Sequence, residues 1–222
     1  MAIAIAQRSL TPPTTSALLE DTERLVYRQT GAGLMGHFLG MVVTSLVYWN
    51  HAPAWLLRSW IVVFLVHWVF RFAGLLAHDR ASMQGTTQSD VWLKRWNMGA
   101  LAGAAIWSGA AMLLYPYGDH FQLTTLMLTI YSFAIGAVPY MASQPKLFLS
   151  CMGLYFLPMI TKTALHGGAD DLHLAGVWCL MGLCTLAVGR SFHHVFGDMV
   201  SLRLYSEELA TRLKGEMKVA ES

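Results

Sequence analysis

The sequence predicts an all-α integral membrane protein, a bundle of six transmembrane helices with both ends of the chain in the cytoplasm. The first observation is composition, because 55% of the 222 residues are hydrophobic and 13% are charged, whereas soluble domains carry about 25% charged residues. The second is that six apolar stretches have the length of about 20 residues that crosses the hydrocarbon core of a bilayer. The third is that all but Arg58 and Lys162 of the 15 lysines and arginines fall on one side of such a bundle.

Each apolar stretch is expected to be helical, because lipid offers no hydrogen-bond partner to a bare backbone N–H or C=O group. The predicted spans are 31–50, 54–77, 96–115, 121–142, 146–165 and 172–191, which together form a bundle over 31–191. An even number of crossings returns the chain to its starting side, and the excess of basic residues on that side independently places both termini in the cytoplasm. Gly99 and Gly103 in the third span predict a close approach of another helix.

The segment before the first span divides into two parts. Residues 1–15 are predicted to be disordered. Residues 16–30 are predicted to form an amphipathic helix on the inner membrane surface, because Thr22 and Val26 share one face with several leucines. Glu23 is expected to point away from that face, together with the other charged residues of the segment.

The segment after the sixth span, 192–222, is predicted to be a helix that continues the span without a break. Its mostly apolar positions recur at spacings of four and three, which is the seam of a coiled coil. The positions of this seam are Val195, Met199, Leu202, Ser206, Leu209, Leu213, Glu216 and Ala220, of which Ser206 and Glu216 are polar. The apolar residues expected to couple the helix to its partner are Val195, Met199, Leu202, Leu209 and Leu213. The pattern indicates a dimeric signalling helix, and the alternative is an amphipathic helix that lies against the membrane.

Three pieces of sequence resemble the multi-helix membrane input modules of bacterial sensor proteins. The piece "ERLVYRQTGAGLMG" is similar to the entry into their first helix, and "LSCMGLYFLPMI" is similar to their proline-bearing fifth helix. The piece "LRLYSEELATRLKGEMKVAES" is similar to the linker of membrane histidine kinases that leads to the phospho-accepting histidine. The resemblance implies the sensor half of a histidine kinase in a bacterial inner membrane, cut before its output domain. Diguanylate and nucleotide cyclases carry similar modules. The chain has no H-box and no Gly-rich ATP site, so the resemblance assigns catalysis to the output domain.

The candidate ligand or signal residues lie within the spans. His67 and Arg71 are four residues apart on one face of the second span, and His37 lies in the first. Ionisable residues at such depth usually face the bundle interior and mark function. The alternatives are a hydrogen-bonded core histidine for His67 and, for Arg71, a side chain that extends to the membrane surface. Pro139 and Pro158 each remove a helical hydrogen bond and permit a kink, which either is a hinge or only shapes the bundle.

The outer connections each contribute a histidine, which suggests a site for a divalent cation. The candidate ligands are His51, His120, His166, Asp170 and His173. The alternative is ordinary solvated loops. A b-type haem needs two axial imidazoles at matching depth, but His37 and His67 lie about 9 Å and about 15 Å from the inner surface at 1.5 Å per residue. The sequence therefore predicts no cofactor, with haem b as the alternative.

Two classes of function remain. The first is a sensor domain that binds a small or membrane-soluble hydrophobic ligand and passes a displacement of the sixth helix to a homodimeric coiled coil. The second is a small membrane transporter or a haem-binding redox subunit, although the sequence shows no internal repeat and no carboxylate within the spans. The basic residues form no nucleic-acid patch, and no HExxH, phosphate-loop or Ser-His-Asp motif is present.

Overall fold

The computed structural model of the chain describes residues 15–166 and 168–220, and within these ranges the fold is entirely helical. Apart from Thr15, the segment 1–15 that the sequence predicts to be disordered lies outside the described residues. The elements are α2 (Thr15–Tyr48), α3 (Ala54–Met83), α4 (Ser89–Leu114), the short 3₁₀ turn η1 (Tyr115–Tyr117), α5 (His120–Met141), α6 (Pro145–His166) and α7 (Ala169–Ala220).

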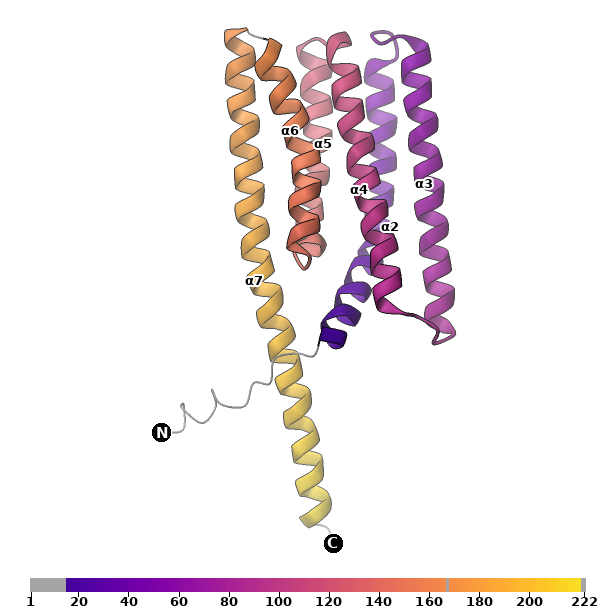
Figure 1. The fold of residues 1–222 in the computed structure, drawn as a ribbon, viewed down its shortest axis with the longest axis vertical. Coiled ribbons are helices and arrows are strands. Elements are labelled where there is room, and N and C mark those ends of the chain that lie inside the picture. The colour runs from indigo at the N-terminus through magenta and orange to yellow at the C-terminus, as the bar shows by residue number, and fades with distance from the viewer. Residues whose placement is uncertain (1–14, 167, 221–222) are drawn as a thin grey trace.

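The six long helices stand side by side and run alternately up and down the bundle (Figure 1). Each contains a stretch that is long and apolar enough to cross a membrane, and each predicted span overlaps a different helix. The prediction of six helices that could span a membrane is therefore confirmed. The first turns of α2 and the last turns of α7 lie toward the same end of the bundle.

The connections between helices are short, and their residues suit tight turns. Gly85 follows the end of α3 with a φ of +65°, a left-handed backbone that glycine adopts without a steric cost. Asp119 precedes α5, and its carboxylate accepts a hydrogen bond from the backbone N–H of Phe121 at 3.0 Å. This contact caps the N-terminus of α5. The tight turns keep consecutive helices antiparallel neighbours.

The start of α2 differs from the sequence expectation. Residues 16–30 and the first apolar stretch form one continuous helix of 34 residues, whereas the sequence suggested a separate surface helix followed by a span. Thr22 and Val26 are buried in the bundle, as is Glu23, which is only 3% exposed. The prediction that Glu23 points away from the apolar face is wrong. Leu19, Glu23, Val26 and Thr30 recur at spacings of four, three and four, so they share one side of a helix.

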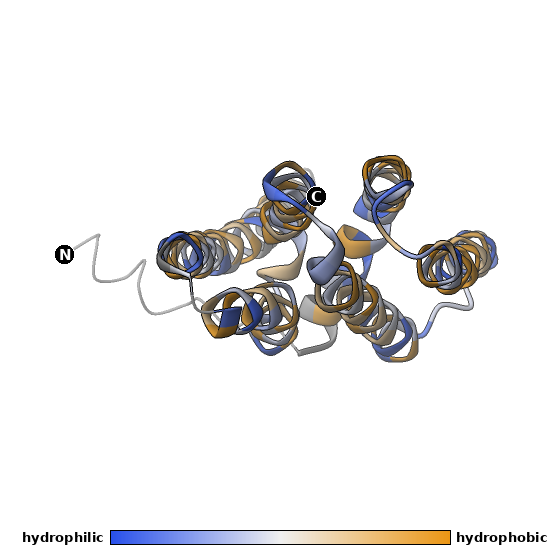
Figure 2. Cartoon of the chain, turned by 90° about the horizontal axis from the view of Figure 1, so that it is seen from above, coloured by the Kyte–Doolittle hydropathy of each residue, from blue (hydrophilic) through white to orange (hydrophobic). Residues whose placement is uncertain are grey.

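The interior of the bundle is rich in aromatic rings, and its exterior is apolar. Trp107 of α4 is 1% exposed and makes ring contacts with Trp60 and Phe64 of α3, at centroid distances of 5.4 Å and 5.9 Å. On the outward face of α3, Val66 and Phe70 are 66% and 74% exposed. Figure 2 shows apolar residues on the outward sides of the helices as well as between them. Such a surface is expected where acyl chains, and not water, surround the helices.

The last helix, α7, has 52 residues and extends well beyond the other helices (Figure 1). Its first part packs on α5 and α6, where Trp178 is 2% exposed and contacts Phe156. At Gly189 a Cβ atom would overlap the ring of Phe148, so glycine permits a close approach of α6 and α7 there. The prediction that the sixth span runs into the C-terminal segment without a break is confirmed.

Candidate functional site

A cavity with a volume of about 580 Å³ lies between α2, α3 and α4. This size falls within the range of about 300–1,000 Å³ that is common for small-molecule sites. Its walls are mostly aromatic and aliphatic. The charged or titratable residues among the lining are Tyr27, His67, Arg71 and Arg95, and the lining includes no aspartate or glutamate among the described residues. The cavity therefore presents positive charge within apolar walls.

Arg71 is the charged group at the back of this cavity. Its Nη1 donates a hydrogen bond to the backbone oxygen of Trp96 at 2.8 Å, and its guanidinium lies 5.2 Å from the centroid of the Trp96 ring. At Gly99 a Cβ atom would lie 2.5 Å from Cδ of Arg71. Because Gly99 has no side chain, Arg71 can pack directly against the backbone of α4 there. Arg71 therefore turns into the bundle, and the alternative of a side chain that extends to the membrane surface does not apply.

His67 lies one helical turn from Arg71 and lines the same cavity. Its Nε2 would be 3.2 Å from a Cβ atom at Gly103, so the second glycine of α4 provides room for the imidazole. The sequence predicts that Gly99 and Gly103 permit the close approach of another helix. The helix that approaches is α3, through the side chains of Arg71 and His67. No hydrogen bond joins His67 to another described residue, and its role as a ligand or signal residue stays a prediction.

A second and much smaller cavity, of about 40 Å³, lies behind Arg71 and is lined by both His37 and His67. His37 packs against Phe133 at a centroid distance of 4.3 Å, and its Nε2 is buried without a hydrogen-bond partner among the described residues. A cavity of this size has room for a water molecule or two. The two imidazoles, which the structure brings to one cavity, do not flank a space of the size of a haem.

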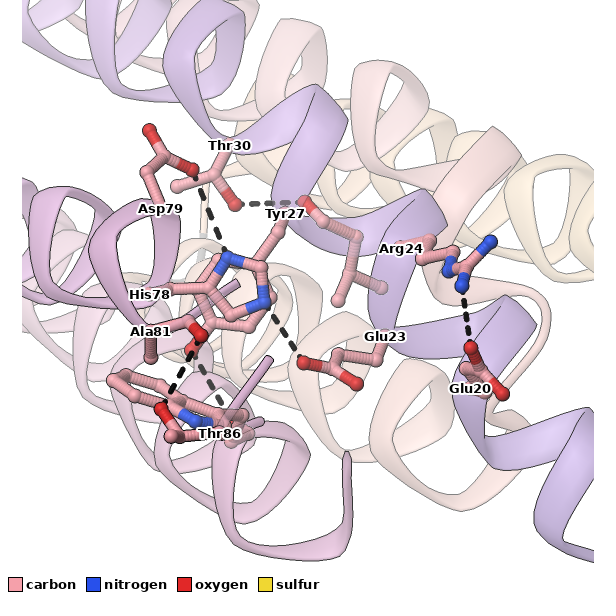
Figure 3. Close-up of polar contacts among 11 residues, drawn as sticks. Glu20, Glu23, Arg24, Tyr27, Thr30, His78, Asp79, Ala81 and Thr86 are labelled. Carbon is pink, nitrogen blue, oxygen red and sulfur yellow. Dashed lines mark hydrogen bonds and ion pairs between the residues drawn. The ribbon is translucent and has the colours of Figure 1, made fainter. Parts of the chain in front are cut away.

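The structure adds a buried pair of ionisable side chains that sequence reasoning missed. Nε2 of His78 in α3 lies 2.8 Å from a carboxylate oxygen of Glu23 in α2, and both side chains are at most 10% exposed. The imidazole stacks on the ring of Tyr27 at a centroid distance of 3.6 Å and an interplanar angle of 7°. Figure 3 shows Glu23 and Tyr27 around His78, with Asp79 on the other ring nitrogen at 3.7 Å. The sequence signal that could have revealed Glu23 is its position four residues after Leu19, which places both side chains on the same side of the helix.

Two hydrogen bonds join α2 to α4 close to this pair in the sequence of α2. The hydroxyl of Tyr27 donates to the backbone oxygen of Trp92 at 3.2 Å. Nε1 of Trp96 donates to the hydroxyl of Thr30 at 2.8 Å. Tyr27, Thr30, Trp92 and Trp96 all line the cavity. The position of the first turns of α2 therefore depends on the same residues that surround the cavity.

The first turns of α2 also contact α7. Nη1 of Arg203 donates to a carboxylate oxygen of Asp21 at 2.9 Å, across 182 residues of sequence. Asp21 is two residues from Glu23, which contacts α3. On the other side of the bundle end, the imidazole Nδ1 of His193 lies 2.8 Å from the backbone oxygen of Ala142, after α5. The α2 contact gives a continuous path from the cavity to the part of α7 that leaves the bundle.

The predicted hinge residues and outer-loop ligands lie away from these cavities. Pro139 is inside α5 and Pro158 is inside α6, and neither lines either cavity. His51 hydrogen bonds the side-chain amide of Gln122 at 2.9 Å, and His166 contacts the ring of Tyr115. Among the described residues, no three His, Cys, Asp or Glu side chains are grouped to hold a metal ion. The set His51, His120, His166, Asp170 and His173 is thus not assembled into one site.

The predicted seam of α7 is exposed along the described part of the helix. The exposed fractions are 51% for Val195, 64% for Met199, 68% for Leu202, 47% for Leu209 and 52% for Leu213. These five apolar side chains are spaced four, three, seven and four residues apart along α7, whose last turns lie beyond the bundle (Figure 1). The structure is of a single chain, so the dimer stays a prediction.

No protein-family model, no curated protein and no solved structure matches this chain.

Proposed function

We propose that this chain is the membrane input module of a bacterial signalling protein of the sensor histidine kinase class. The module lies in the inner membrane with both termini in the cytoplasm. It binds a small, membrane-soluble molecule in the cavity between α2, α3 and α4, and it relays the presence of that molecule through α7 to a kinase output domain. The active form is a homodimer held together along the seam of α7.

The observation that carries this proposal is the continuity of α7. One unbroken helix packs inside the bundle at Trp178 and carries the exposed seam from Val195 to Leu213. A rigid helix transmits a displacement over its whole length, whereas a flexible linker would absorb it. Leu209 and Leu213 are exposed beyond the candidate membrane span Asp170–Arg203, and burial against a second copy of the same helix would remove them from water.

The relay has a structural basis in the contacts of α2. A molecule in the cavity touches Tyr27 and Thr30, which belong to the same turns of α2 as Asp21 and Glu23. A shift of these turns changes the distance between Asp21 and Arg203 on α7. Ligand binding can bias such a two-state arrangement only as far as it favours one state over the other.

The oligomeric state tests the proposal most directly. We expect the purified chain in phosphatidylcholine nanodiscs to be a colourless dimer by light scattering. The triple variant Leu202→Ser, Leu209→Ser, Leu213→Ser should be a monomer of unchanged helical content. The matched control replaces Tyr205 and Met217, which are exposed on the same segment but outside the seam, and it should remain a dimer. A wild-type monomer, or a protein with the Soret band of haem, contradicts the proposal.

Transport is a second candidate, because the structure places a carboxylate inside the bundle. The predicted spans contain no carboxylate, but Glu23 is buried in the helix that includes the first span and is paired with His78. Buried ionisable pairs occur in proton-coupled transporters. Uptake of a solute into proteoliposomes that is abolished by Glu23→Gln would support transport over sensing.

A further inference from the structure

We propose that the cavity between α2, α3 and α4 binds an amphipathic anion, a molecule with a carboxylate or phosphate head and an alkyl tail. Arg71 and Arg95 bind the head, and the tail lies against the apolar wall between Phe70 and Met98. This inference rests on the proposed function, since it names the class of ligand for the same cavity. The charge of the cavity, the unused donors of Arg71 and the position of the opening each support it.

The charge of the cavity selects for an anion. Two arginines and one histidine line it, and no acidic side chain is part of the lining among the described residues. Both guanidinium groups lie over indole rings, Arg71 over Trp96 at 5.2 Å and Arg95 over Trp92 at 5.0 Å from the centroids. The contact of a guanidinium with an aromatic ring uses none of its N–H donors for a hydrogen bond, so these donors can bind a carboxylate or phosphate. A cation would meet two like charges in this site.

The donors of Arg71 are largely unused. A guanidinium carries five N–H donors, and the structure pairs one of them, with the backbone oxygen of Trp96. The buried acidic group nearest in sequence to the cavity residues of α2, Glu23, is engaged with His78 and so does not neutralise the arginine. A partly buried charge with unpaired donors costs free energy unless a counter-ion is bound. An anionic head with two oxygens supplies both the charge and the acceptors.

The opening of the cavity faces the apolar exterior of the bundle. Phe70 on α3 and Met98 on α4 line the cavity and are 74% and 72% exposed. Between His67 and Ala77 the wall on α3 extends about 15 Å along the helix axis at 1.5 Å per residue. The cavity thus opens on the outer surface of the bundle, where acyl chains lie. It accommodates an alkyl chain along this wall when the anionic head is bound at Arg71. The ligand therefore arrives from the bilayer and not from the outer loops.

The test uses the full chain in phosphatidylcholine nanodiscs, with dodecanoate as the probe. Isothermal titration calorimetry, corrected with empty nanodiscs, measures the affinity of dodecanoate, dodecanol and dodecyltrimethylammonium. We expect dodecanoate to bind and the other two to bind at least about tenfold more weakly, since a hydrogen bond to a charged group is worth that factor or more. A photoreactive dodecanoate should label α3 and α4 near Phe70 and Met98.

Three variants locate the site. Arg71→Gln should weaken dodecanoate binding at least about tenfold, whereas Arg58→Gln, the same change at an exposed position of α3, should leave it unchanged. Gly74→Leu provides a test that does not depend on the fold tolerating a lost arginine. A Cβ atom at Gly74 would meet nothing within 4 Å, so the leucine should fill the cavity, lower the affinity and preserve thermal stability.

The outcomes separate the source of the anion and the two proposals. Competition by phosphatidylglycerol in the nanodisc would support the inference and identify a lipid headgroup as the anion, and its absence would identify a free fatty acid. Equal binding of dodecanol, or unchanged binding to both Arg71→Gln and Gly74→Leu, would overturn the inference and leave the proposed function intact. Dodecanoate binding in a protein whose α7 segment is monomeric would overturn the proposed function and leave the inference intact.

Discussion

The two halves of the bundle differ in what they bury. The half formed by α2, α3 and α4 contains Glu23, His78 and Arg71, and it contains the large cavity. In the described parts of α5, α6 and α7, the buried polar side chains are all uncharged, namely Gln122, Thr163 and Thr185. This second half also contains both helix-interior prolines, at Pro139 and Pro158, and it carries the long helix α7.

The difference indicates a division of roles between the halves. Buried charges lower stability unless they are paired, and they are retained where they serve binding or a switch. An apolar, tightly packed half provides a fixed support for α7. We therefore expect substitutions of buried residues in α5 and α6 to change stability alone, and substitutions of buried residues in the first half to change ligand binding or the position of α7 as well.

The largest effect is expected from Met159→Ala in the second half. Met159 is fully buried in α6, and truncation of such a side chain lowers the free energy of unfolding by about 2–5 kcal/mol. Thermal unfolding in nanodiscs should show the loss, while dodecanoate affinity stays unchanged. The control Leu157→Ala truncates a neighbouring side chain that is 63% exposed and should have a much smaller effect. Equal losses in the two variants would mean that α6 is not packed as described.

A smaller loss is expected from Glu23→Ala in the first half. The change leaves His78 buried without its partner, which costs about 1–3 kcal/mol of the free energy of unfolding. Glu20→Ala removes the exposed pair with Arg24 and should change it by less than about 0.5 kcal/mol. The double variant Glu23→Leu, His78→Phe should recover much of the stability, because both polar partners are then absent. No recovery would indicate that the pair does more than satisfy its own hydrogen bond.

Gly99→Ala should act on binding more than on stability. The new methyl group would meet Cδ of Arg71, and the flexible arginine would have to move. We expect dodecanoate affinity to fall by up to about tenfold, or about 1.4 kcal/mol, with little change in thermal stability, since alanine favours a helix over glycine. Gly109→Ala is the matched control in the same helix, because a Cβ atom there meets nothing within 4 Å. An equal fall in both variants would remove the link between Gly99 and the site.

The smallest effect on stability is expected from Asp21→Asn. A surface ion pair is worth about 0.2–1 kcal/mol, and the side chains of Asp21 and Arg203 are 21% and 56% exposed. Spin labels at Gln29 and Asp198, both exposed and outside the seam, should nevertheless report a broader distribution of distances between α2 and α7. Asp90→Asn breaks a comparable exposed pair with Lys94 in α4 and should leave that distribution unchanged. An unchanged distance distribution in Asp21→Asn would mean that the pair of Asp21 and Arg203 does not couple α2 to α7.

The helices were predictable from sequence because apolar length is a local property of the chain. The continuity of α7 was predictable for the same reason, since no strong helix breaker interrupts it. The pair of Glu23 and His78 was not predictable, because its members are 55 residues apart and only packing brings them together. Glu23 does share one side of the helix with Leu19 and Val26. Its charge nevertheless predicted a position on the polar face. The inward direction of Arg71 likewise depends on an absent side chain in another helix, at Gly99.

The spacing of Asp21 and Glu23 has a consequence for the kind of motion that α2 can pass on. An α-helix turns about 100° per residue, so two side chains two residues apart point to nearly opposite sides. One holds α7 through Arg203, and the other holds α3 through His78. A sideways shift of α2 away from α3 and toward α7 therefore shortens the contact with Arg203 while it lengthens the contact with His78. A rotation about the axis, or a slide along it, would displace both contacts by equal amounts, so the two contacts are coupled in opposite senses only by a sideways movement of α2.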